Sequence, residues 1–181
     1  MAVPALPSSE TAGNVYTAAK VNTIRSLQQW HRDTAPVFKG QAWDGTLNQV
    51  ATSTTTTFGF GSAGSFENTP IINVGGWTVQ GSDSDPESLV VPESGIYVVS
   101  VFNHWAADSS GFRSTQIFLD GSGVSGGRVI GPAAPTGVTM QNLTTVLDLA
   151  ANDELDVSVN QSSGSTLAAT VYLAAYWIRS T

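Results

Sequence analysis

The chain has 181 residues, of which 41% are hydrophobic and only 12% are charged, and its formal net charge is −7. This length suits one compact domain with a short appendage and is too short for two full domains. The absence of cysteine excludes disulfide scaffolds, thiol catalysis and zinc sites built on thiolates. Serine, threonine and glycine replace the missing charged residues, which is typical of a protein made of strands and turns.

The charge is divided unevenly along the chain. Residues 1–40 hold four cations and two anions, a net +2, whereas residues 41–181 hold three cations and twelve anions, a net −9. Nucleic-acid binding relies on lysine and arginine to displace counterions from phosphates. The acidic body therefore predicts that the protein binds no nucleic acid.

The N-terminal part is predicted to contain an arm and one helix. Residues 1–16 combine prolines with small residues, so we expect an extended arm that orders only against a partner. In residues 17–33 apolar side chains recur every three residues, which predicts an amphipathic helix that packs against its own domain, self-associates or docks on another protein. We interpret it as an anchoring helix, with an apolar stripe that consists of Val21, Ile24, Leu27 and Trp30.

Residues 34–42 are expected to form a linker, because Pro36 pushes the residue before it out of the helical conformation. The N-terminus has no basic segment followed by an apolar run, and no stretch of about 18 apolar residues occurs in the chain. The sequence therefore predicts no membrane insertion.

Residues 43–181 are predicted to form a head domain made of strands. Short segments rich in valine, threonine, isoleucine and aromatic residues alternate with turn residues. This pattern favours an all-β jelly-roll sandwich of about ten strands in two sheets. The expected strands are 47–58, 66–73, 76–80, 87–91, 95–107, 113–119, 128–130, 138–149, 154–160 and 167–178.

Two of these strands, within 96–105 and 167–178, are apolar on both faces. A sandwich strand normally has one face in water, and no helix is left over to cover the sheet, so the pattern predicts a subunit interface. We assign the interface face to Tyr97, Val99, Val101, Tyr172, Tyr176 and Ile178. The core face is assigned to the side chains of opposite parity, including Val98, Phe102, Val171 and Leu173.

No catalytic constellation is found in the sequence. Residues 59–64 match the spacing of a dinucleotide-binding loop and residues 123–127 that of a nucleophile elbow, but neither is followed by the helix that its motif requires. We interpret the second stretch as a glycine-rich hairpin. His31 and His104 both precede Ser125, whereas an α/β-hydrolase places its histidine after the serine.

Acidic clusters lie at 83–87 and 153–156. Carboxylates can hold calcium, but neither cluster has the spacing of a calcium-binding loop, so we interpret both as solvated turn acids. We therefore predict that the chain has no catalytic residue, no cofactor and no metal site.

Three segments of the head carry a family resemblance. Residues 91–101 read VPESGIYVVSV, residues 113–121 read RSTQIFLDG and residues 147–157 read LDLAANDELDV. Together they resemble strand and turn motifs of the complement globular-head and tumour necrosis factor-like jelly rolls, which implies a homotrimer. Asn152 stands where that family usually has glycine, and because asparagine tolerates a left-handed backbone we expect the turn to be kept.

Residues 11–43 resemble the opening of minor tail and fibre proteins of tailed bacteriophages, in which a short helix leads through a proline-containing link to such a head. This resemblance implies a virion protein that is assembled in the host cytoplasm. Residues 1–40 would bind other virion proteins, and the head would project toward a glycan or protein on the host surface.

The sequence thus predicts a non-enzymatic, trimeric tail-associated or fibre protein. One alternative is a capsid decoration or head-fibre protein, which shares every sequence feature with the first. Another alternative, from a different class, is a glycan-binding or glycan-degrading module.

Overall fold

The computed structural model describes residues 18–42, 49–60, 71–80 and 88–181. Within these residues it contains one helix, α1 (Ala18–Asp33), and twelve strands. The strands are β1 (Val37–Ala42), β2 (Gln49–Val50), β3 (Thr55–Phe58), β4 (Ile72–Val74), β5 (Thr78–Gln80), β6 (Ser88–Val90), β7 (Gly95–Trp105), β8 (Phe112–Leu119), β9 (Ser122–Pro132), β10 (Thr139–Leu149), β11 (Glu154–Gln161) and β12 (Leu167–Arg179).

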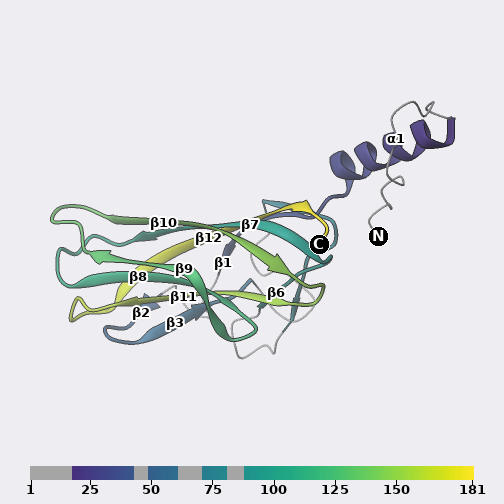
Figure 1. Cartoon of the computed structure of the whole chain (residues 1–181). Helices are drawn as coiled ribbons and strands as arrows, with labels where there is room; N and C mark the ends of the chain where they lie inside the picture. The colour runs from purple at the N-terminus through teal and green to yellow at the C-terminus, as the bar shows by residue number, and fades with distance from the viewer. Residues whose placement is uncertain (1–17, 43–48, 61–70, 81–87) are drawn as a thin grey trace.

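The strands form two antiparallel sheets that stack face to face (Figure 1). The first sheet has the order β10-β7-β12-β1-β4, with β2 attached to β12, and the second has the order β5-β6-β11-β8-β9, with β3 attached to β11. From β6 to β12 the chain changes sheet at every connection except the β8–β9 hairpin, which is jelly-roll connectivity. The predicted two-sheet sandwich with an N-terminal helix is therefore confirmed, with twelve strands instead of about ten.

The core lies between the two sheets and is built from alternate residues of the long strands. Along β7 every second residue is buried, and the same alternation runs along most of β12. Aromatic rings fill the space between the sheets: Phe38 packs edge-on against Phe60, with ring centroids 5.4 Å apart, and Trp77 packs edge-on against Tyr97 at 5.7 Å. Full burial of one such side chain contributes about 1.5–3 kcal/mol, so this core carries most of the stability of the head.

The register between β7 and β12 corrects part of the predicted interface. Val101 lies opposite Leu173, and Tyr97 lies opposite Trp177. Residues directly opposite each other in an antiparallel pair share a face, and Tyr97, Val99 and Val101 are fully buried in the core. The assignment of these three side chains to a subunit interface was therefore wrong.

The outward face of β7 instead carries Val98 and Phe102, which were wrongly predicted for the core and are half-buried. In β12 the prediction of core residues is confirmed, because Val171 and Leu173 are fully buried. The error is a shift of one residue in β7 alone, which exchanges the two faces of a strand.

Helix α1 extends from one end of the sandwich (Figure 1). Its described range, 18–33, lies within the predicted 17–33, and residue 17 lies outside the described residues. The helix ends before Pro36, where the amide groups of Thr34 and Ala35 donate to the Trp30 carbonyl. The predicted linker 34–42 is corrected, since Val37–Ala42 is β1, which lies between β12 and β4. Its Phe38 is fully buried, so this part of the chain belongs to the head.

The turn before β11 has the predicted backbone. Asn152 has a φ of 74°, in the left-handed region that asparagine tolerates better than most residues. Its amide donates to the Val91 carbonyl at 2.8 Å, and the Val91 amide donates to the Asp153 carbonyl at 2.9 Å. These two bonds join the turn to the segment that leads into β7.

Candidate functional site

The outer face of the first sheet carries several large apolar side chains and is the main candidate for an interface. Polar groups lie among them, since Ser100 and Thr144 face outward between the apolar residues with their hydroxyl oxygens 2.9 Å apart. Tyr172 lies opposite Phe102 and Tyr176 opposite Val98 in the β7–β12 pair, and Val146 lies opposite Val98 on the other side of β7. These side chains therefore share one face across three neighbouring strands. Val146 is 61% exposed and Tyr176 is 43% exposed, so the face is open to solvent.

This apolar face contains a shallow hollow of about 240 Å³. The rings of Phe102 and Tyr172 border it, with their centroids 6.4 Å apart, and Lys39 of β1 reaches its edge. An exposed cluster of large apolar side chains of this kind is typical of an interaction site. We refer to the outer face of β10, β7 and β12 as the apolar face.

Three of the six predicted interface residues belong to this side of the molecule. Tyr172 and Tyr176 lie on the apolar face, and Ile178, at the irregularity that ends the β7–β12 pairing, is 44% exposed. The sequence reasoning missed Met140 and Val146 of β10, which are 62% and 61% exposed. Their even-numbered spacing along the strand was the signal that could have identified them.

The residues of the predicted anchoring stripe all lie on α1, but within the described part of the chain only one of them packs against the head. Trp30 is buried, and its ring packs edge-on against Trp177 of β12 with centroids 4.8 Å apart. Trp30 therefore holds the helix to the head, and its assignment as an anchor to another protein is corrected. Val21, Ile24 and Leu27 are half-buried on the part of α1 that extends beyond this contact.

The connections β7–β8, β9–β10 and β11–β12 lie at the end of the sandwich opposite α1 (Figure 1). A fully buried arginine, Arg113, supports the first of these loops. Its guanidinium donates to the carbonyl groups of Asp108 at 3.0 Å and Ser110 at 2.9 Å, and lies 3.7 Å from the Asp108 carboxylate. Burial lowers the pKa of Arg113, and the Asp108 charge partly offsets this effect.

A buried amide continues this polar cluster between the sheets. Gln141 of β10 accepts hydrogen bonds from Trp105 Nε1 at 3.2 Å and Thr115 Oγ1 at 2.8 Å, and it donates to the Arg113 carbonyl at 2.9 Å. The hydrogen bonds of Gln141 and Arg113 fix the base of the loops at this end. Two atoms of the cluster, Arg113 Nε and Asn103 Oδ1, are buried without a hydrogen-bond partner.

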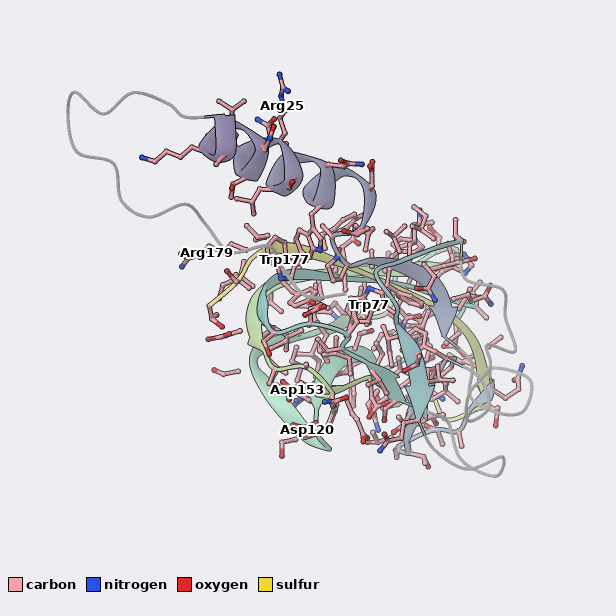
Figure 2. All side chains as sticks on the ribbon, turned by 90° about the vertical axis from the view of Figure 1, so that its right-hand side faces the viewer. Arg25, Trp77, Asp120, Asp153, Trp177 and Arg179 are labelled. Carbon is pink, nitrogen blue, oxygen red and sulfur yellow. The ribbon has the colours of Figure 1, made fainter. Side chains whose placement is uncertain are left out.

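The acidic groups near the start of β11 serve the fold. Asp153 accepts a hydrogen bond from the Ala150 amide within its turn, and Asp120 accepts one from the Glu154 amide (both aspartates are labelled in Figure 2). Burial raises the pKa of Asp156, with a smaller contribution from the charge of Glu154. Among the described residues, no three carboxylate or histidine side chains are arranged to hold a metal ion. The other predicted acidic cluster, 83–87, lies outside the described residues.

The structure describes one of the two motif-like glycine stretches completely and the other in part. Residues 123–127 lie in β9, so their interpretation as part of a hairpin is confirmed. Residues 61–64 of the other stretch lie outside the described residues. No helix in the described part of the chain is long and apolar enough to cross a membrane.

No family model matches the sequence, and no curated protein matches it. Among solved structures, the fold is similar to that of PRD1 vertex protein P5, with a TM-score of 0.57 and 16% sequence identity. The similarity covers 80% of this chain and 74% of that chain. At this identity the likeness concerns the fold, so the chain shares a sandwich architecture with a vertex protein.

Proposed function

We propose that this chain is a non-enzymatic structural protein of a phage virion, attached to the particle through its N-terminal segment and projecting its head toward the host surface. The observation that carries the proposal is the placement of α1 and the connections β7–β8, β9–β10 and β11–β12 at opposite ends of the sandwich (Figure 1). A protein that binds the particle at one end and the host surface at the other requires this arrangement. The resemblance of residues 11–43 to phage tail and fibre proteins, and the fold likeness to a vertex protein, support it.

The assembled form is a homotrimer, in which the subunits contact one another through the apolar face. Tyr172, Tyr176 and Val146 would be buried around the three-fold axis, because closed symmetry removes exposed apolar surface from water without leaving a free edge. The second sheet then faces outward in each subunit. Light scattering of the full chain at micromolar concentration tests this, and a monomer mass contradicts it.

Two positions on the particle remain as candidates. The resemblance of the N-terminal part favours the tail, whereas the name of the structural neighbour favours a capsid vertex. Electron microscopy of particles carrying a gold-labelled copy of the full chain distinguishes the two. If the label is found at neither position, the proposed virion role is contradicted.

A further inference from the structure

A polar groove lies on the outer face of the second sheet, across β3, β11, β8 and β9. It has a volume of about 270 Å³ and is lined mainly by hydroxyl, amide and guanidinium groups. This face belongs to the sheet opposite the apolar face, so trimer formation through the apolar face leaves the groove in solvent.

Strand register arranges the groove as two polar rows. Ser158 lies opposite Thr57 on one side and Gln116 on the other, and Gln116 in turn lies opposite Arg128. These four side chains come from four strands and share a face. The pattern is a row of hydrogen-bonding groups that runs across the strands.

The second row lies two residues further along the strands. Asn160 lies opposite Thr55 and Ser114, and its Nδ2 donates to Thr55 Oγ1 at 3.4 Å. Ser114 accepts a hydrogen bond from Arg128 Nε at 3.1 Å. Ser114 is only 4% exposed, so the floor of the groove is polar and already fixed.

An aromatic ring closes one end of the groove. Phe118 of β8 is half-buried and lies opposite Gly123 of β9. A Cβ atom at Gly123 would overlap the Nε2 atom of Gln116. The absence of a side chain there leaves room for the Gln116 amide beside the ring.

Arg128 gives the groove its charge. Of the three cations in residues 41–181, Arg113 is buried in the core and Arg179 lies at the end of β12, so Arg128 is the one that lines the groove. It is exposed, and among the described residues its only hydrogen bond is the one from Nε to Ser114. A guanidinium with free N–H groups binds an oxyanion in a planar, two-bond geometry.

We propose that the polar groove binds an acidic oligosaccharide. The accessible polar groups of Gln116, Asn160 and Thr55 exchange hydrogen bonds with sugar hydroxyls, while Ser114 and Ser158 form the buried floor. The Phe118 ring packs against the apolar face of a sugar ring, and Arg128 binds the anionic substituent. This combination favours a glycan over a peptide, because the groove offers a single aromatic contact and many neutral hydrogen-bonding groups. The inference rests on the proposed role in host-surface contact and names the ligand class.

The test applies the purified full chain to an array of oligosaccharides that bear uronate, sialate or phosphate groups, printed beside neutral oligosaccharides. We expect binding to acidic members. The Arg128→Ala and Phe118→Ala variants should each weaken binding to the best acidic member about tenfold to a hundredfold, as measured by titration calorimetry. The matched control, Arg179→Ala, removes an exposed cation outside the groove and should leave the affinity within about twofold.

The proposal would be overturned if the chain bound only neutral members or no member of the array. It would also be overturned if the Arg128→Ala variant bound acidic members as tightly as the natural protein does. Comparison of the affinities for uronate-bearing and phosphate-bearing oligosaccharides identifies which anionic group the groove binds. Incorporation of Arg128→Ala into particles is measured separately. Normal incorporation together with loss of glycan binding supports both proposals, whereas glycan binding by a protein that never joins a particle overturns only the virion role.

Discussion

The indole ring of Trp30 packs edge-on against that of Trp177, with 4.8 Å between the ring centroids. This contact joins the last turn of α1 to the final strand of the head. The Trp177 amide also donates to the Pro36 carbonyl at 3.0 Å, directly after the helix. In Figure 2 the labelled Trp177 lies at the side of the head that faces α1. The direction in which the helix leaves the sandwich is therefore set by side-chain packing.

The Trp30 and Trp177 pair should be measurable as a coupling energy. An edge-on aromatic pair contributes about 0.5–1.5 kcal/mol beyond the burial of its area. A double-mutant cycle with Trp30→Ala and Trp177→Ala, read by urea denaturation, should return a coupling in this range. Limited proteolysis should also cleave Trp30→Ala between α1 and β1 faster than the natural protein, and equal cleavage would contradict the role of the contact.

Replacement of Val146 by aspartate should dissociate the proposed trimer. The side chain is 61% exposed on the apolar face, so the change is tolerated in a single subunit but places a charge in each of three contacts. Ile130 of β9 is a matched control, because it is 55% exposed on the other sheet. Sedimentation equilibrium should give a monomer for Val146→Asp and a trimer for Ile130→Asp, and the same mass for both would rule out the apolar face as the interface.

The two faces of β7 can be compared with one kind of substitution. Val101→Thr places a hydroxyl in the core at a fully buried position, which should cost about 1–3 kcal/mol. Val98→Thr makes the same change on the half-buried outward face and should cost less than about 0.5 kcal/mol. Both are measured by urea denaturation at a protein concentration at which the natural chain is a monomer, so that assembly does not contribute.

Arg113 should stabilise the loop 106–111 at the end opposite α1. Arg113→Met removes the donors to the Asp108 and Ser110 carbonyl groups and leaves the Asp108 carboxylate without its ion pair. We expect a loss of about 1.5–3 kcal/mol in the free energy of unfolding, because hydrogen bonds from a charged donor are lost while the Asp108 side chain, 21% exposed, stays in contact with water. Hydrogen exchange should accelerate first in 106–111, while Arg128→Met, an exposed change, should alter neither measurement.

Asp156 should make the head less stable as the pH rises. Burial raises the pKa of this carboxyl, so the folded state holds the proton more tightly than the unfolded chain does. Stability is therefore lost as the pH rises from about 3.9, the ordinary value, through the raised pKa in the folded state. Asp156→Asn should become the more stable protein over this range. Chemical denaturation at successive pH values measures this, and a constant difference between Asp156→Asn and the natural protein at all pH values would contradict it.

Local features of the chain were sufficient to predict several elements. The apolar spacing of three in residues 17–33 and the proline at 36 predict α1, because both signals are local features of the sequence. The left-handed backbone at Asn152 follows in the same way from the tolerance of asparagine. Alternation and turn residues likewise predict β7, β8, β10, β11 and β12, because period-two patterning acts within a strand. For β9 the prediction covered only residues 128–130 of Ser122–Pro132.

Pairing between distant strands decided what the sequence left open. Alternation divides β7 into two sets of side chains. Each set contains several large apolar side chains and at least one polar one, Ser100 and His104 in one set and Asn103 in the other, so composition alone does not mark the outer face. Only the pairing of Val101 with Leu173 places the odd-numbered set of β7 in the core. Trp30 belongs to the helical stripe by its spacing, yet its partner Trp177 is 147 positions away. Burial energy depends on contacts of this kind between separate elements, and these exist only in the folded chain.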